Sequence, residues 1–481
     1  MKRLMMAALL PVIVAGCTNS NNNSQSPLAP GSERAIKVSA NALTVTSLDG
    51  VALAGAQVLI GDALNFPFEG NFLTTDANGQ VEIPASWTEA QPVTIQAKGY
   101  VRQTYMSVQP GAVSFKLRPL NTVSQFEIKG QATGLPIKNG DGNIDFGLVM
   151  QGFSKMQLFA FNMDSVLSAQ NDKISAIGQE MDIPANLSLP QQKEKYALFT
   201  VTLDKPAYRI YFGQPGVTRV FVAKGTFPFK TIVDGVRGGA KLYEMLNVFN
   251  LTGGAVRDVN LSKGRTDLDL PTNEIAFSVK NTVVAPQFRA DETFMAAGLS
   301  GQGGFLLPTD VKKLNAGQKI TLNTAPNMEA NVLAVLTKTE DLRANIDRVS
   351  TAILPMNGTT APQVLPLINN PIIGAGGLEI AMPSFQTVAG VNPLATYAVF
   401  SNEIQVQMGA DKVKLMNQTW EVYADKWVAS MKVPTFPNDT LMTGVKRWEV
   451  NFLGSQTASQ APMGAAMIEA ATHVTHSSVN F

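Results

Sequence analysis

The sequence predicts an all-β protein built of antiparallel β-sandwich domains in tandem. Apolar and polar residues alternate along many short segments, as they do in a strand with one buried face. The clearest such segments are Leu43–Thr46, Val93–Gln96, Val113–Leu117 and Phe199–Leu203. Turn-forming Gly, Pro, Asn and Asp separate the segments at short intervals, for example at Asp49-Gly50 and Asn78-Gly79, which is typical of sandwiches. Helical periodicity is confined to residues 164–177 and 340–346.

The first sixteen residues have the features of a secretory signal peptide. The cations Lys2 and Arg3 precede an apolar stretch that runs from Leu4 to Ala15. As a helix this stretch of about 12 residues would cover roughly 18 Å, which is too short to span a bilayer. It ends in Val14-Ala15-Gly16-Cys17, with small residues at the exit. We therefore expect residues 1–16 to be removed on export.

The ending Val14-Ala15-Gly16-Cys17 resembles the lipobox of bacterial lipoproteins. This resemblance implies cleavage before Cys17, a diacylglycerol on its thiol and usually an acyl chain on its amine. Thr18 stands where Asp would imply retention at the inner membrane, so the resemblance implies the outer membrane. Cys17 is the only cysteine, so it has no intramolecular disulfide partner. The alternative for Cys17 is an unmodified cysteine at the signal-peptide boundary.

Composition limits the possible functions of the mature chain. Residues 17–35 begin TNSNNNSQSPLAP after Cys17, a polar segment that predicts a flexible tether. The chain has 38 basic and 37 acidic residues without a cationic run, which disfavours nucleic-acid binding. With two histidines in the chain, most routes to metal or acid–base chemistry are closed. We expect no cofactor.

Residues 36–120 carry a recognisable pattern. Asp49-Gly50 and Asn78-Gly79 suit tight hairpin turns that need positive φ, Gly55-Ala56 is small where strands pack, and Gly99-Tyr100 ends a strand. The segment resembles the carboxypeptidase regulatory-like domain, a sandwich related to prealbumin. The resemblance implies a seven-stranded module without catalytic residues, which accompanies peptidases, receptors and surface proteins.

The rest of the chain divides on composition alone. We expect β-rich domains at residues 121–270 and 271–355, and a linker rich in Pro, Gly, Asn and Thr at residues 356–371. Residues 372–481 resemble an immunoglobulin or fibronectin-type sandwich in their strand spacing. The last two domains could instead form one larger domain.

One weak calcium candidate lies at Asn139, Asp141 and Asp145, which take the third, fifth and ninth places of an EF-hand loop. The first and twelfth places are then Ile137 and Leu148, where calcium needs carboxylates. We therefore expect a hairpin turn here and no metal.

The two histidines form the pair His473 and His476. Their β-branched neighbours predict a strand, where residues three apart face opposite sides. This placement disfavours metal chelation.

Three tryptophans are predicted to lie in the core. Trp448 alternates with Arg447 and Glu449 along one strand, and Trp420 and Trp427 alternate in the same way. Trp87 is the one tryptophan expected to be exposed.

The sequence thus predicts a lipid-anchored envelope or cell-surface protein of β-sandwich modules, with a binding or structural role and no catalysis. Its expected location is the outer membrane, with its partner an envelope protein or glycan and its ligand unidentified. The alternative is an envelope hydrolase with paired carboxylates on a sandwich scaffold. No spacing among the 37 acidic residues singles out such a pair.

Overall fold

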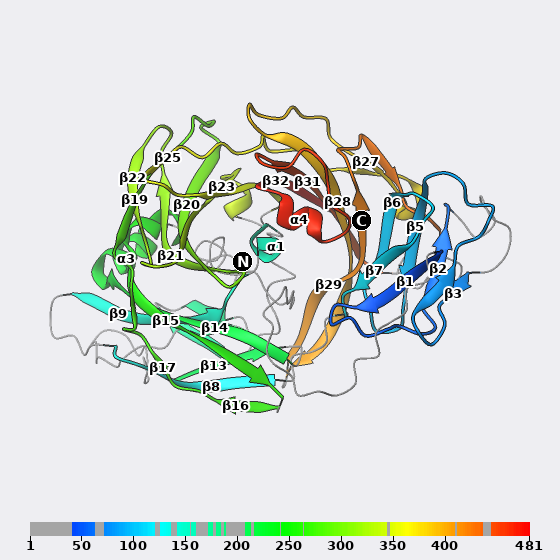
Figure 1. The fold of residues 1–481 in the computed structure, drawn as a ribbon. Helices are drawn as coiled ribbons and strands as arrows, with labels where there is room; N and C mark the ends of the chain where they lie inside the picture. Colours follow the sequence, from blue (N-terminus) through cyan, green and yellow to red (C-terminus); the bar gives the residue numbers. More distant parts are fainter. Residues whose placement is uncertain are drawn as a thin grey trace. The chain divides into compact units, whose positions relative to one another are not determined.

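The protein is all-β, as the sequence predicts (Figure 1). A computed structural model describes most of the chain after residue 40. The described residues are 41–62, 72–120, 126–135, 142–153, 155–159, 172–176, 179–183, 187–188, 207–212, 216–240, 242–262, 264–343, 347–408, 411–435 and 444–481. None of the described helices is long and apolar enough to cross a membrane.

The chain folds into two compact units. The terminal unit takes its described residues from Ser20–Asn121, Ile368–Ile404 and Lys414–Phe481, and the inserted unit takes its own from Thr122–Leu367 and Gln405–Val413. Both the first described strand and the C-terminus therefore belong to the terminal unit. This unit takes in the described residues of 36–120 and those of 372–481 apart from Gln405–Val413, two segments that we expected to be separate domains.

The terminal unit contains two groups of strands from opposite ends of the chain. The first group is β1 (Ala42–Ser47), β2 (Gln57–Ile60), β3 (Leu73–Thr74), β4 (Gln80–Glu82), β5 (Gln91–Gln96), β6 (Arg102–Val108) and β7 (Val113–Leu117). The second is β26 (Ile372–Ile373), β27 (Glu379–Ala381), β28 (Asn392–Met408), β29 (Asp411–Ala424), β30 (Ser430–Lys432), β31 (Lys446–Ser455) and β32 (His473–Asn480), with short helices η4 (Ala375–Gly377) and α4 (Ala466–Ala470).

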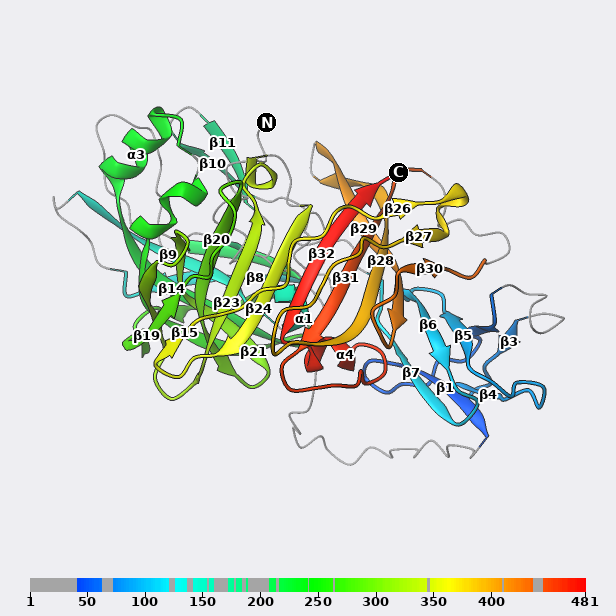
Figure 2. The ribbon, with the colours of Figure 1, turned by 90° about the horizontal axis from the view of Figure 1, so that it is seen from above.

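A continuous sheet joins the two groups. Its order within the terminal unit is β32-β31-β28-β29-β6-β5-β2-β3, and its strands lie side by side in Figures 1 and 2. The junction is a parallel pair in which Arg102 of β6 lies opposite Trp420 of β29, and Tyr105 lies opposite Tyr423. Two smaller sheets, β4-β1-β7 and β26-β27-β30, complete the unit.

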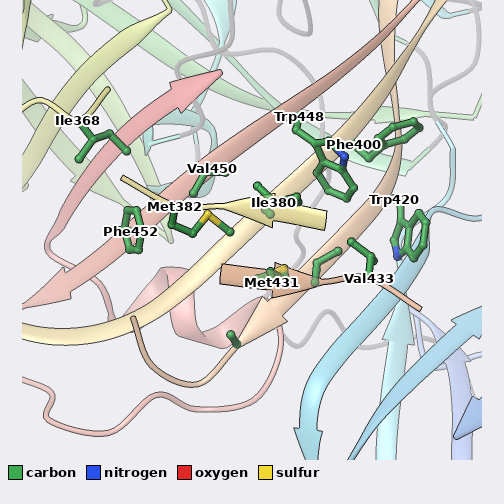
Figure 3. Packing of buried hydrophobic residues seen from close by; sticks show 13 residues of the cluster. Ile368, Ile380, Met382, Phe400, Trp420, Met431, Val433, Trp448, Val450 and Phe452 are labelled. Carbon is green, nitrogen blue, oxygen red and sulfur yellow. The ribbon is translucent and has the colours of Figure 1, made fainter. Parts of the chain in front are cut away.

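The core of the C-terminal half lies between β26-β27-β30 and the long sheet (Figure 3). Ile380 of β27 and Met431 of β30 face Phe400, Trp420 and Trp448 of the long strands. Strand alternation places both indoles on this face, so the predicted burial of Trp448 and Trp420 is confirmed. Each indole N–H also has an acceptor, which a buried tryptophan usually finds.

Trp427, the third predicted core tryptophan, packs against the same cluster and is half-buried. The prediction for Trp87 was wrong, since only 3% of it is exposed. Trp87 lies between β4 and β5, where its backbone N–H donates to the carbonyl of Pro84. No strand alternation exists there from which its direction could be predicted.

In the first module the predicted turns and strands are present. β1, β5 and β7 contain the three expected segments of this region, and Gly50 and Gly79 adopt φ of 78° and 70°. β1 pairs antiparallel with β4 but parallel with β7. The sheets of this unit are therefore mostly antiparallel, with parallel pairs at β1–β7 and β6–β29.

The inserted unit holds two sandwiches. The first contains β8 (Phe126–Thr133), β9 (Asn143–Gln151), β12 (Leu187–Ser188), β13 (Ala207–Phe212), β14 (Gly216–Pro228), β15 (Asn250–Leu261), β16 (Arg265–Asp267), β17 (Leu270–Pro271) and β18 (Ile275–Ala276). The second contains β19 (Val279–Val284), β20 (Glu292–Gln302), β21 (Phe305–Leu314), β22 (Lys319–Thr324), β23 (Glu329–Lys338), β24 (Arg348–Pro355) and β25 (Thr359–Thr360).

Each sandwich has its own core. In the first, apolar residues of sheet β12-β9-β14-β15-β18 pack on those of β13-β8-β16 around Val222 and Ile128. In the second, the run β21-β20-β23-β24 packs on β22-β19-β25 around Phe294 and Leu322. The short helices α1 (Lys155–Phe159), α3 (Phe229–Arg237), η2 (Leu242–Val248) and η3 (Asp341–Arg343) lie in the connections.

One helix prediction was wrong. Asp172–Ala176, the described part of the expected helix at 164–177, is strand β10, which pairs antiparallel with β11 (Gln179–Ile183). The hairpin gives these short segments their backbone partners, which an apolar period alone cannot anticipate. In the second expected helix, at 340–346, Asp341–Arg343 form the 3-10 turn η3, and residues 344–346 lie outside the described part of the chain. The strand expected at 199–203 also lies outside it.

Candidate functional site

The long sheet of the terminal unit has a second face that is polar and also buried. Along β29, Trp420 and Val422 face the apolar core, so Glu421 and Tyr423 face the other way. Only 1% of Glu421 is exposed. A buried carboxyl group must be fully hydrogen-bonded to be tolerated, so the residues around Glu421 have to supply its donors.

Glu421 accepts five hydrogen bonds. Its Oε1 accepts from Nη2 of Arg118 at 2.9 Å, from Nε of Arg118 at 3.1 Å and from the hydroxyl of Tyr397 at 3.1 Å. Its Oε2 accepts from Nε2 of Gln103 at 3.1 Å and from the hydroxyl of Tyr423 at 2.9 Å. Five donors shared by two oxygens fill the acceptor capacity of a carboxylate. We call these five residues the Glu421 hub.

Local structure places each member of the hub. Gln103 lies directly opposite Glu421 in the parallel β6–β29 register. Arg118 follows β7 immediately, and its carbonyl accepts from the N–H of Val101. A third bond of Arg118 runs from Nη2 to Oε1 of Gln418 at 3.0 Å. The hub therefore fastens the end of the N-terminal module to the C-terminal strand β29.

The two tyrosines of the hub stack with each other, and Tyr423 also stacks with Tyr105. Tyr423 lies between Tyr105 and Tyr397, with ring centroids 5.1 Å away on each side. Tyr105 donates to Oε1 of Gln103 at 2.9 Å, which orients the amide of Gln103 toward Glu421. Such offset aromatic pairs add to the packing energy of the buried area.

Electrostatics keep the tyrosines as donors. Burial raises the pKa of Tyr397 and Tyr423 well above the usual 10.0, and the neighbouring Glu421 raises it further. Burial alone would lower the pKa of Arg118, but the charge of Glu421 and its hydrogen bond raise it above its ordinary value. The guanidinium thus stays charged and the phenols stay neutral over the whole physiological pH range.

A second polar cluster lies on β31 and β32. Nη2 of Arg447 donates to Oγ of Ser478 at 2.6 Å, and Nε lies 3.7 Å from Oε1 of Glu449. Nδ1 of His476 lies 3.0 Å from Oδ1 of Asn451. Burial and, to a smaller extent, the positive charge of Arg447 lower the pKa of His476 to about 3. This histidine is a neutral structural residue at neutral pH.

The predicted strand around the histidine pair is confirmed, since His473 and His476 both belong to β32. Nδ1 of His473 lies 2.8 Å from the hydroxyl of Thr472. Within the described part of the chain, no three His, Cys, Asp or Glu residues gather in a way that could hold a metal ion.

Of the other predicted site residues, the structure describes only Asp145. Cys17, Asn139 and Asp141 lie outside the described residues. Asp145 is part of β9, opposite Thr226 of β14. The lipidation and calcium predictions therefore stay predictions.

Glu421 and Glu449 are two buried carboxyl groups of the same sheet that bear on the hydrolase alternative. They project from β29 and β31, on either side of β28, which places their strands roughly 10 Å apart. Each is only 1% exposed and faces an arginine, so a polysaccharide has no access to this pair.

No sequence signal identifies the hub as a unit. Arg118 and Glu421 are 303 positions apart, and no local period relates them. The one hint is the alternation Trp420-Glu421-Val422-Tyr423, which separates the two faces of β29 but does not say that both are buried.

Comparisons with known proteins identify no family. No family model and no curated protein matches this sequence. Among solved structures, a mutant of the major pilin subunit of Bacillus cereus is 11% identical, with 67% of this chain and 98% of the pilin covered and a TM-score of 0.14. A mutant α2-macroglobulin of Salmonella is 12% identical, with 89% of this chain and 27% of that chain covered and a TM-score of 0.12. These TM-scores are too low for either likeness to bear on fold or function.

Proposed function

We propose that this protein is a lipid-anchored component of the bacterial envelope or cell surface, and that its β-sandwich modules bind a partner or have a structural role there. The observation that carries the proposal is the run Val14-Ala15-Gly16-Cys17 after a short apolar stretch. Cys17 would be the anchor. Two or three acyl chains would hold the protein at the membrane, because each buried CH₂ contributes about 0.8 kcal/mol.

The position of the first strand supports this assignment. β1 begins at Ala42, so a segment of about 25 residues separates it from Cys17. A chain of this length can reach at most roughly 80 Å. The folded modules could therefore work at a distance from the lipid surface, against an envelope protein or a glycan.

The buried polar groups support a binding or structural role over catalysis. Glu421 is saturated by its five donors, and Arg118 holds it in place. Burial and neighbouring charge keep His476 neutral. These residues therefore stabilise the fold, and the proposal gives none of them a catalytic role.

Lipidation is tested with Cys17→Ser. The wild-type protein should incorporate labelled palmitate and sediment with outer-membrane fractions, whereas the variant should lose the label and appear in the soluble envelope fraction. A Thr18→Asp variant is the matched control, because it should keep the label and move to the inner membrane. A Cys17→Ser protein that remains membrane-bound in the same amount would contradict the anchor.

The partner is tested separately, by crosslinking on intact cells. Recovery of one abundant envelope protein or glycan with the wild type, reduced with Cys17→Ser, would support a binding role at the membrane. Hydrolysis of an envelope polymer by the purified protein would favour the hydrolase alternative.

A further inference from the structure

Both ends of the described chain belong to the terminal unit, and the inserted unit lies between them in sequence. Under the proposed function, on which this inference rests, tension from the membrane enters the fold at Ala42, the start of β1. The terminal unit would then carry that tension from strand to strand.

The first contact on this path of tension is the strand pair β1–β7. The two strands are parallel, with Leu43 opposite Val113 and Ser47 opposite Leu117. In a parallel pair the N-terminal end of one strand and the C-terminal end of the other lie at opposite ends of the ladder. Tension that enters at Ala42 and leaves after Leu117 therefore acts along the strands, and all the ladder hydrogen bonds share it at once.

Burial protects this ladder from water. Every residue of β1, from Ala42 to Ser47, is buried. On its other side the N–H of Val45 donates to the carbonyl of Gly79 at 2.7 Å. A Cβ at Gly79 would overlap the carbonyl oxygen of Val45, so the two backbones leave no room for a side chain at Gly79. Water has little access to replace these bonds one at a time.

The second step is the joint after β7. Arg118 is fixed to Glu421 of β29, and the N–H of Leu120 donates to the carbonyl of Gly99 at 2.9 Å. Beside this joint, β6 and β29 form a second parallel ladder, and the indole N–H of Trp420 donates to the hydroxyl of Thr104 at 2.8 Å. The N-terminal module is thus tied to the C-terminal half without a covalent route through the inserted unit.

We propose that the terminal unit is a mechanical clamp, in which the β1–β7 ladder and the Arg118–Glu421 joint carry tension between the membrane anchor and the C-terminal half. The inserted unit stays unloaded until the clamp opens. A protein built in this way can hold an anchored partner under tension while the inserted sandwiches keep their fold.

Single-molecule force spectroscopy on the full mature chain tests the clamp. Cys17→Ser removes the only cysteine, so an introduced cysteine gives a unique attachment point. In the first geometry the protein is pulled between Ser20→Cys and a tag after Phe481. In the second the N-terminal attachment moves to Asp49→Cys, in the exposed turn after β1.

The two geometries load the same ladder differently. From residue 20 it is loaded along the strands. From residue 49 the pull begins at the end where Ser47 and Leu117 meet, so the bonds open in succession. In the first geometry the first opening should release about 75 residues, or roughly 260 Å of contour length. It should need at least twice the force of the first opening in the second geometry. Equal forces, or a first event that includes the inserted unit, would overturn the proposal.

A variant tests the joint. When the Glu421→Gln variant is pulled from residue 20, the Arg118–Glu421 joint should open first, and the tension should then pass through the inserted unit, which is the remaining covalent connection. The exposed control Glu379→Gln should behave like the wild type. An unchanged first event with Glu421→Gln would overturn the role of the joint. If Glu421→Gln does not fold, the comparison of the two geometries still decides. The force experiment uses unlipidated protein, so its result does not depend on lipidation at Cys17. The clamp proposal and the anchor proposal can therefore be refuted independently of each other.

Discussion

The Glu421 hub gives the most direct prediction about stability. Glu421→Gln keeps the shape of the side chain but removes the negative charge from a residue that is only 1% exposed. The remaining amide oxygen can still accept from Arg118 and Tyr397. The new NH₂ group replaces Oε2 and faces two donors, the amide of Gln103 and the hydroxyl of Tyr423. Arg118 is left as a buried cation without its counter-charge.

The magnitude follows from these losses. Removing one partner of a buried ion pair costs about 3–5 kcal/mol, because the other charge stays desolvated. A domain is stable by only about 5–15 kcal/mol, so the terminal unit should lose a large part of its stability. For a unit of this size the melting temperature should fall by roughly 6–20 °C.

Tryptophan fluorescence is a selective assay for this unit. The chain has four tryptophans, and Trp87, Trp420, Trp427 and Trp448 all fall in the terminal unit. Urea unfolding followed by their emission therefore reports this unit and not the inserted one. The exposed Glu379→Gln should change the free energy of unfolding by less than about 0.5 kcal/mol.

A double variant separates charge from packing. Arg118→Met together with Glu421→Met should recover part of the stability that either single change removes, since apolar residues can replace a buried pair at little cost. The reasoning is refuted if Glu421→Gln costs less than about 1 kcal/mol, or if the double variant costs the sum of the two single variants Arg118→Met and Glu421→Met.

Two further predictions concern other buried positions. Gly79→Ala should destabilise the terminal unit by at least about 1 kcal/mol more than Gly50→Ala: both positions have positive φ, which costs about 1–2 kcal/mol for alanine, but only at Gly79 would the methyl group meet the carbonyl of Val45. Equal losses in urea unfolding would contradict this close approach. Because the pKa of His476 falls from 6.5 to about 3 on folding, the unfolded chain binds a proton between these pH values that the folded chain does not. Stability should therefore fall as the pH drops through this window, by up to about 1.4 kcal/mol per pH unit from this residue. His476→Gln should flatten the decline, and identical pH profiles for variant and wild type would rule the effect out.

Local periodicity explains what the sequence could predict. The alternation around Trp448 identifies its buried face because a strand repeats every two residues, and Asp49-Gly50 and Asn78-Gly79 identify turns because glycine readily adopts positive φ. Both signals lie within a few residues. Trp87 has no such period around it, and its burial depends on chain segments that the local sequence does not specify.

The pairing of β6 with β29 is the part that no local pattern could predict. Residues 36–120 have the turns and strands of a complete module, so the sequence favours an independent domain. Yet Gln103 and Tyr105, which alternation alone would turn toward solvent, lie against Glu421 and Tyr423. A polar strand face can be satisfied equally by water or by a second polar strand face, and its composition is similar in the two cases. The two cases differ in how many side-chain donors are held around one carboxylate. That number depends on which strands pair in the assembled sheet. This pairing of β6 with β29, together with the Arg118–Glu421 contact, is also what allows the N-terminal module to pass tension to the C-terminal half in the proposed clamp.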